Sequence, residues 1–298
     1  MVSDKTIVIG ALARDCADSI LRNKARIEAL RSHFSKSYVV IIENDSKDAT
    51  KQVLSDYAAE CDGVTIISQD FNGNFPFRYD GRPLTPDMSC MRIARMAFIR
   101  NLLLDYIEKN IVSDYTLFLD IDILDFSVTG IINAIEQAPQ DWGALLANGR
   151  EHISFAGHIF PLCAQYDTYA LLFDKETMND IPLSFTKSTT KLCRGIKADK
   201  MVRQQQYTHM LSAFGGIGIY KSAAIRGLRY DIFVPKAWQG HSISICEHIP
   251  FNHKMRGECY IASSLNVTYH IDSPLKKGHT LKRRCLLLYL TMRHYLHC

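Results

Sequence analysis

The chain has 298 residues, of which 47% are hydrophobic and 22% are charged, and its net charge is +4 at pH 7. These values fit one large soluble α/β domain or two small ones, and they exclude fibrous and disordered chains. Hydrophobic runs are too short for a transmembrane helix, and no secretory signal precedes the first apolar segment. The nine scattered cysteines form no C-x-x-C pair, which predicts reduced thiols in a cytoplasmic protein.

The positive charge is concentrated at the C-terminus. Residues 276–298 contain six Lys or Arg and no Asp or Glu, so the rest of the chain is slightly acidic. A nearly neutral body argues against nucleic acid as a partner. The basic residues lead into a leucine-rich segment, which predicts an amphipathic tail on an anionic membrane surface. The alternative is a C-terminal helix packed on the body with a solvated basic edge. We therefore expect a cytoplasmic protein, either free or peripheral at the inner face of the membrane.

Apolar strands and amphipathic helices alternate through the first half of the chain. Residues 6–12 predict a buried strand, followed by a helix with Ile20, Ile27 and Leu30 on one face. The segment YVVIIEND predicts a second strand that ends in a turn, and a helix and a short strand, 64–68, follow.

A loop at 70–89 separates this region from a predicted long helix, and a loop of that length is typical of a functional segment. The later elements are expected at 90–110 (helix), 115–119 (strand), 128–137 (helix) and 143–148 (strand), with short strands at 168–173, 214–220 and 259–269.

This order predicts an α/β fold with a mainly parallel, Rossmann-like sheet flanked by helices, and a looser α+β half after Gly149. We expect residues 1–149 to form a nucleotide-binding half, 150–275 an acceptor half fused to it, and 276–298 the basic tail.

Polar residues follow the predicted strands directly. Arg14 comes after the first strand, and Glu43 and Asp45 come after the second. In an open α/β sheet these loops converge on one crevice, where a carboxylate could accept hydrogen bonds from a ribose or base. The segment ENDSKD could equally be a helix-capping turn, and the two roles are compatible.

The most informative stretch is YTLFLDIDILDF, in which a buried strand runs into Asp120 and Asp122. Strand side chains alternate, so both carboxylates can face one side while Ile121 and Ile123 face the other. Paired carboxylates at a strand exit suit Mg²⁺ or Mn²⁺, which commonly bridge to a diphosphate.

The predicted helix at 90–110 carries Arg92, Arg95 and Arg100. Arg92 and Arg95 are i, i+3 neighbours and share a face. One of these arginines could hold a diphosphate or brace the aspartates, because guanidinium groups form forked hydrogen bonds with such anions. A solvated basic face is the alternative.

A glycine-rich run, FGGIGIYK, indicates close backbone approach by a ligand or another chain. Downstream, Glu247 lies beside His248 in an apolar setting. Glu247 could be a general base toward an acceptor hydroxyl, and His248 could orient it or complete a metal site with Asp120 and Asp122.

Together these stretches resemble the fungal capsule-associated mannosyltransferases of the CAP59-like family. The resemblance extends over roughly residues 5 to 270 and includes VIIENDSKDAT, RIARMAFIRNLLL, LFLDIDI, WGALLANGR, YDTYAL and CEHIPFN. It implies a GT-A type fold and a glycosyltransferase, in particular a hexosyltransferase such as a mannosyltransferase. It also implies a GDP- or UDP-sugar donor, Mn²⁺ or Mg²⁺ on Asp120 and Asp122, and a nucleotide site bordered by Glu43 and Asp45. Glu247 and His248 would border the acceptor and the metal.

We expect no N-terminal anchor like that of the fungal members, so the sugar and the acceptor stay open. A glycan or lipid-linked acceptor in surface polysaccharide synthesis would suit the basic tail. An inverting enzyme would use Glu247 as base, whereas in a retaining enzyme Glu247 would only bind acceptor. Two other classes are a nucleotidyltransferase that makes nucleotide sugars and a non-catalytic sugar-binding homologue. A nucleotidyltransferase would need a glycine-rich nucleotide loop after the first strand, and the segment ALARDCADS contains no glycine. The presence of both Asp120 and Asp122 argues against a non-catalytic homologue.

Overall fold

The computed structural model describes residues 1–75, 78–79, 82–83, 90–155, 158–241 and 243–272, and the isolated positions 285, 288, 289 and 292. The basic residues of the predicted tail, from Lys276 to Arg293, lie outside the described residues, as does most of the 76–89 part of the predicted loop. Within the described part of the chain, no helix has both the length and the apolar character needed to span a membrane.

Ten strands form one mixed sheet in the order β10-β12-β8-β11-β6-β1-β2-β3, with β7 paired to β12 and β9 paired to β8. The strands on the main path are β1 (Thr6–Ala13), β2 (Lys36–Glu43), β3 (Val64–Ser68), β6 (Tyr115–Asp120), β8 (Trp142–Phe155), β10 (Tyr207–Met210), β11 (Ile217–Lys221) and β12 (Glu258–Asp272). The others are β7 (Asp125–Phe126), β9 (His158–Gln165) and a small hairpin of β4 (Arg78–Tyr79) and β5 (Arg82–Pro83).

The N-terminal part of the sheet is parallel, as the alternating pattern predicts, because β3, β2, β1 and β6 all run the same way. Strand β11 then enters antiparallel between β6 and β8. Beyond it, β12 runs parallel to β8 and β10 antiparallel to β12. The two predicted halves therefore share one continuous sheet.

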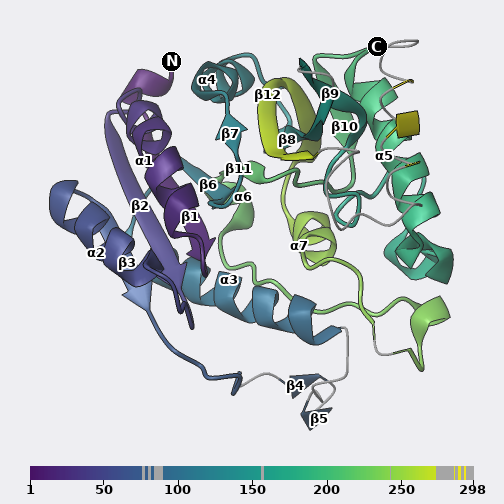
Figure 1. Cartoon of the computed structure of the whole chain (residues 1–298), viewed down its shortest axis with the longest axis horizontal. Coiled ribbons are helices and arrows are strands. Elements are labelled where there is room, and N and C mark those ends of the chain that lie inside the picture. Colours follow the sequence, from purple (N-terminus) through teal and green to yellow (C-terminus); the bar gives the residue numbers. More distant parts are fainter. Residues whose placement is uncertain are drawn as a thin grey trace.

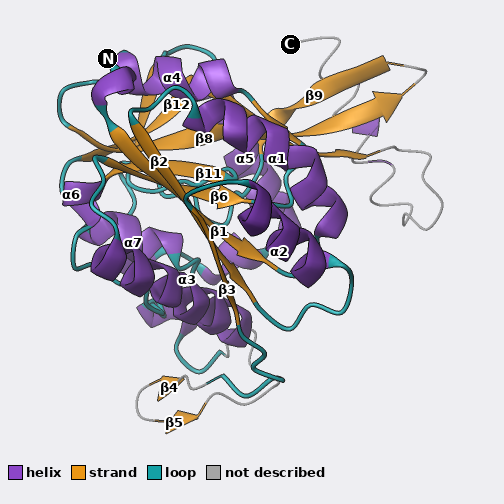
Figure 2. Cartoon of the chain, turned by 90° about the vertical axis from the view of Figure 1, so that its left-hand side faces the viewer, coloured by secondary structure: helices purple, strands orange, loops and turns teal. Residues whose placement is uncertain are grey.

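Helices cover both faces of this sheet (Figures 1 and 2). They are α1 (Ala17–Arg31), α2 (Thr50–Glu60), α3 (Cys90–Asn110), α4 (Val128–Glu136), α5 (Ser188–Val202), α6 (Ser222–Ile225) and α7 (His248–Lys254). One core joins alternate residues of β1 and β2, such as Val8 and Val40, to α3, α5 and α7. The other joins the intervening residues, such as Ile7 and Ile9, to α1, α2 and α4. This two-sided burial explains why the first strands are apolar throughout.

Two expectations from the sequence are wrong, one about a strand at 168–173 and one about the cysteines. The segment 168–173 is a turn with a single bridge, Leu172 to Ser212, because its apolar residues pack in the core without a strand ladder. The thiols are not all reduced, since Cys163 is disulfide-bonded, whereas Cys16, Cys61, Cys193, Cys246, Cys259 and Cys285 are free.

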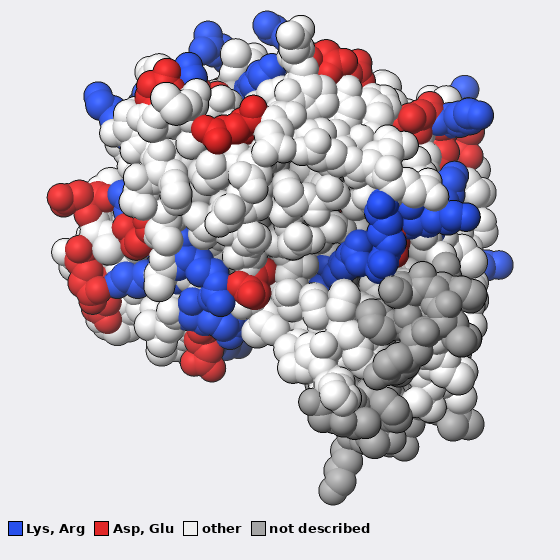
Figure 3. Space-filling view, turned by 90° about the horizontal axis from the view of Figure 1, so that it is seen from above, with Lys and Arg blue, Asp and Glu red and all other residues white. Residues whose placement is uncertain are grey.

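Charged side chains on the face seen in Figure 3 lie mainly around the rim, and the centre of that face is largely uncharged. Charge on this face is therefore arranged in local groups.

Candidate active site

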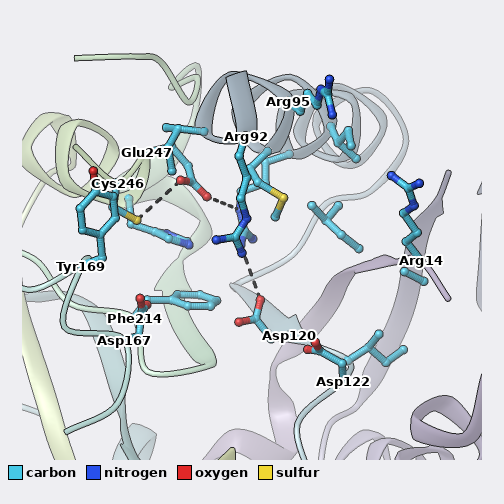
Figure 4. A pocket seen from close by; sticks show the side chains of 18 of the residues that line it. Arg14, Arg92, Arg95, Asp120, Asp122, Asp167, Tyr169, Phe214, Cys246 and Glu247 are labelled. Carbon is cyan, nitrogen blue, oxygen red and sulfur yellow. Dashed lines mark hydrogen bonds and ion pairs between the residues drawn. The ribbon is translucent and has the colours of Figure 1, made fainter. Parts of the chain in front are cut away.

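A cavity of about 460 Å³ opens where β1, β2 and β6 end, between α3 and the start of α7. Figure 4 shows side chains from both halves of the chain pointing into it. Its polar lining residues from the first half are Arg14, Asn44, Arg92, Arg95, Arg100, Asp120 and Asp122, and those from the second half are Tyr166, Asp167, Tyr169, Glu247, His248 and Tyr269. The crevice thus lies at the carboxyl ends of the parallel strands, where ligands bind in open α/β sheets.

Asp120, Ile121 and Asp122 line the cavity, and the side chains of Ile121 and Ile123 are buried in the core formed with α1, α2 and α4. Strand β6 ends at Asp120, so Asp122 lies in the turn that follows. The Asp120 carboxylate accepts a hydrogen bond from the Tyr269 hydroxyl at 3.1 Å. The Asp122 side chain is exposed and contacts no hydrogen-bond or ion-pair partner among the described residues. One carboxylate is therefore held in place, and the other is available to a ligand.

Arg100 on α3 is the buried cation of the site. Its Nη2 lies 3.5 Å from Asp120 Oδ1, and its Nε donates to Glu247 Oε1 at 3.2 Å. The guanidinium also lies over the rings of Phe214 and Tyr230, at 5.3 and 5.6 Å from their centroids. Arg100 therefore links a carboxylate from each half of the chain, and it is the arginine that braces the predicted aspartate.

Burial raises the pKa of Asp120 to about 6, Arg100 acts against this rise, and the neighbouring Asp122 adds to it. A buried carboxyl beside a second carboxylate resists ionisation until a cation compensates the charge. The site thus carries excess negative charge at its strand end.

Glu247 and His248 lie at the start of α7, and both are almost fully buried. The Glu247 carboxylate is already engaged with Arg100. The His248 ring stacks on Phe214 with centroids 4.0 Å apart, and neither ring nitrogen has a hydrogen-bond partner among the described residues. Burial, with a smaller contribution from Arg100, holds the pKa of His248 well below its usual value, so the imidazole is neutral.

The predicted metal set of Asp120, Asp122 and His248 is not assembled as a cluster. Among the described residues, no three His, Cys, Asp or Glu side chains are grouped so that they could hold a metal ion. The apolar neighbours of His248 explain this, because they place its ring against Phe214 in the core. His248 borders the cavity without joining the aspartates.

Asp167 is a site residue that the sequence reasoning did not select. It lines the cavity in the turn after β9, with a left-handed backbone at φ 51°. Burial, together with repulsion from Asp120 and Glu247, raises the pKa of Asp167 to about 8. Among the described residues it has no ion-pair partner, and a backbone hydrogen bond from Gly215 lowers its pKa only in part. The sequence feature that could have pointed to Asp167 is the segment YDTY, in which this aspartate lies between two tyrosines after an apolar strand.

The remaining predicted residues divide into two groups. Arg14, Arg92 and Arg95 line the cavity, although the Arg95 guanidinium points away from the aspartates in Figure 4 and lies over the Phe75 ring. Glu43 and Asp45 are not among its lining residues, whereas Asn44 between them is.

Glu43 and Asp45 serve the turn after β2. Glu43 is fully buried, and its carboxylate accepts from the Ser46 backbone N–H at 2.9 Å and from the Ser68 hydroxyl. Asp45 accepts from the Asn72 backbone N–H at 2.8 Å. Both carboxylates thus hold the turn after β2, but neither caps α2, whose N-cap Ala49 has no side-chain cap hydrogen bond.

No protein-family model and no curated protein sequence matches the chain. Among solved structures, the chain is similar to a mannosyltransferase from Pyrobaculum calidifontis in complex with GDP-Man and Mn²⁺. The identity is 11% and the TM-score 0.50, over 99% of this chain and 65% of the mannosyltransferase, so the chain spans about two thirds of that protein's length.

Weaker likenesses are TarS from S. aureus and glucosyl-3-phosphoglycerate synthase from Mycobacterium tuberculosis. TarS has 13% identity and a TM-score of 0.45, over 98% of this chain and 72% of that one. The synthase has 9% identity and a TM-score of 0.41, over 97% and 78%. The likeness to the mannosyltransferase shows the fold, which is of the GT-A type as predicted.

We expect Glu43→Ala to lower the free energy of unfolding by about 1–3 kcal/mol, because it leaves buried donors without an acceptor. Urea denaturation measures this change. The control is Glu60→Ala, since Glu60 is 63% exposed in its side chain and pairs with Lys24 at the surface, and its loss should change stability by less than about 1 kcal/mol. If Glu43→Ala stayed as stable as wild type but lost nucleotide binding, Glu43 would be a ligand residue after all.

Proposed function

We propose that the chain is a metal-dependent glycosyltransferase that moves a hexose from a nucleotide-diphosphate sugar to a hydroxyl of a glycan or glycolipid. One observation carries the proposal. The Asp122 carboxylate, which has no hydrogen-bond or ion-pair partner among the described residues, lies beside Asp120, which Arg100 holds in place. Both line a cavity at the strand ends of a GT-A fold, and arginines line the same cavity.

The residues present fit a divalent cation. Asp120 and Asp122 supply hard carboxylate oxygens. Burial, with a smaller contribution from Asp122, raises the pKa of Asp120, and a bound cation would favour its ionised form. Mg²⁺ and Mn²⁺ are commonly bound by one or two carboxylates, with substrate phosphates and water as the other ligands. When bound, such an ion would stabilise negative charge on a departing diphosphate. The Mn²⁺ and GDP-Man of the Pyrobaculum calidifontis complex support this assignment and a GDP-sugar, with a UDP-sugar as the other option.

Arginines and aromatic rings occupy different parts of the cavity lining. Arg14 directly follows β1 and Arg92 comes from α3, and both suit the diphosphate, because guanidinium groups pair with phosphate oxygens. Tyr166 and Tyr269 stack on each other with ring centroids 3.6 Å apart on the side of the second half. We assign the arginine side to the donor and the aromatic side to the acceptor. A role in surface polysaccharide synthesis would follow from a lipid-linked acceptor.

For an inverting reaction, the acceptor hydroxyl must lose its proton to a base, and two carboxyl groups are candidates. Glu247, the residue expected from the sequence, already has its carboxylate Oε1 in a buried ion pair with Arg100 Nε. Asp167 forms no ion pair among the described residues, and its pKa of about 8, which burial raises and Arg100 lowers only in part, lies near the range that suits general-base catalysis. We therefore propose Asp167 as the base and Glu247 as the group that holds Arg100 in place.

Asp122→Asn should weaken Mn²⁺-dependent binding of GDP or UDP at least tenfold, because it removes a charged metal ligand while breaking no contact within the protein. Calorimetry with and without Mn²⁺ measures this loss. Asp125→Asn is the matched control, since Asp125 is exposed nearby and pairs with Arg26 outside the cavity. Equal affinity of wild type and Asp122→Asn would remove the metal assignment.

The affinity for Mn²⁺ should fall as the pH drops below about 6, where a proton on Asp120 competes with the cation. The folded-state pKa of about 6 lies above the ordinary value of 3.8, so the folded protein binds this proton more tightly than the unfolded chain. The contribution of Asp120 to stability is therefore present below pH 3.8 and is lost as the pH rises through 6. Mn²⁺ titrations at pH 5, 6 and 7 measure the change in affinity. A constant affinity over this range would contradict the role of Asp120.

Asp167→Asn should lower turnover by about 10²–10⁴-fold, the usual range for loss of a general base, while nucleotide binding stays unchanged. It should also remove the acidic limb of the pH profile of kcat/KM. Glu247→Gln is the comparison, because it keeps the shape of a residue that we assign to positioning, and it should retain that limb. If Glu247→Gln lost the limb and Asp167→Asn stayed within about threefold of wild type, Glu247 would be the base.

If both variants kept wild-type turnover, neither carboxyl group would be the base, and a retaining mechanism would be favoured.

A further inference from the structure

A second cavity, of about 480 Å³, lies between the end of α5 and strands β8 and β12. It shares no lining residue with the candidate active site. Two arginines, Arg150 and Arg203, line it together with Asn148, Ser263 and the glutamines at 204–206. No Asp or Glu side chain is among the described lining residues, so the surface offered to a ligand is basic and rich in hydrogen-bond donors.

Both arginines share one buried carboxylate behind the cavity. Arg150 Nη2 lies 2.8 Å from Asp199 Oδ1, and Arg203 Nε donates to Asp199 Oδ2 at 2.8 Å. The Asp199 side chain is only 3% exposed. One carboxylate compensates one of the two guanidinium charges, so the cluster keeps a positive charge beside the cavity.

A network of amides, in which Asn148 and Gln165 are buried and Asn266 is exposed, fixes Arg150. Asn148 Oδ1 accepts from Arg150 Nε at 3.2 Å and from Gln165 Nε2 at 2.6 Å. Asn148 Nδ2 donates to Asn266 Oδ1 at 2.9 Å. Buried polar networks of this kind are costly unless every member is satisfied, and when satisfied they hold side chains rigidly. Arg150 is therefore held in a set orientation at the edge of the cavity, and little side-chain entropy would be lost on binding.

A structural ion pair alone would need only one arginine. Burial lowers the pKa of Arg150, and Arg203 lowers it further despite the attraction of Asp199. The repulsion between the two guanidinium groups would be relieved by a second anion on the solvent side.

We propose that this cavity is a binding site for an oxyanion group, either a phosphate or a carboxylate, held by Arg150 and Arg203. Such pairs form the strongest charge-assisted hydrogen bonds, and the planar guanidinium matches both anions. The glutamine amides at 204–206 and the Ser263 hydroxyl surround the anion with further polar groups. The proposal does not rest on the proposed glycosyltransferase activity.

The site is separated from the candidate active site by one strand. Asn148 and Arg150 flank Gly149 on β8, and the Gly149 carbonyl accepts from the backbone N–H of Tyr166, which lines the active-site cavity. Val202 beside the second cavity and Phe214 beside the first belong to the same hydrophobic core, so the two cavities lie at different places around one core.

The test is calorimetric titration of the full chain with inorganic phosphate and, separately, with D-glucuronate. Arg203→Gln should weaken binding of the preferred anion at least tenfold. Lys200→Gln is the matched control, because Lys200 is an exposed cation on the same helix outside the cavity, and it should bind like wild type. Tighter binding of phosphate or of glucuronate identifies which oxyanion the site prefers.

A second variant covers the case in which Arg203→Gln unfolds. Gln204→Glu places a negative charge in the cavity without touching Asp199, and it should also weaken anion binding at least tenfold. Arg92→Gln reports on the active-site cavity. The proposal is overturned if wild type binds neither anion, if Gln204→Glu binds like wild type, or if only Arg92→Gln loses binding.

Discussion

The contact of Arg100 with Asp120 and Glu247 is the interaction on which the candidate site depends. Arg100 comes from α3, Asp120 from the end of β6 and Glu247 from the start of α7, so one buried cation joins three elements that are distant in the sequence. Removing one partner of a buried charge pair costs about 3–5 kcal/mol, because the remaining charge stays in a poorly solvated place. The positions of both carboxylates thus follow from the packing of a single helix.

This arrangement gives the carboxyl groups around one cavity different electrostatic settings. Asp120 and Glu247 form ion pairs with Arg100, and Asp122 faces solvent. Asp167 is buried without an ion pair among the described residues and feels Arg100 only at a distance. Groups of one chemical kind can serve as metal ligand, positioning group and proton acceptor when their surroundings differ in this way. The second cavity shows the opposite case, in which two guanidinium groups share one carboxylate and keep a positive charge.

Much of the strand-end chemistry could be predicted because it is local. Alternation along YTLFLDIDI places Asp120 and Asp122 together, and the turn after a parallel strand points to the crevice. The choice among Arg92, Arg95 and Arg100 could not be made, because it depends on which face of α3 packs against β6 and α7. The apolar run at 168–173 could not be told from a strand by its pattern. The pKa of Asp167 is raised first by burial and then by Asp120 and Glu247, and both causes depend on how the fold packs distant parts of the chain.

The place of β11 and β12 in the sheet has a consequence for how the chain is made. On the ribosome, β6 and β8 leave the exit tunnel long before Ile217–Lys221 and Glu258–Asp272, the strands that pair with them. The first half therefore cannot complete its sheet until these later strands have emerged, and until then its strand edges are open to wrong pairing. Glu247 also follows β11 in the chain, so its contact with Arg100 forms only after the first half has been made.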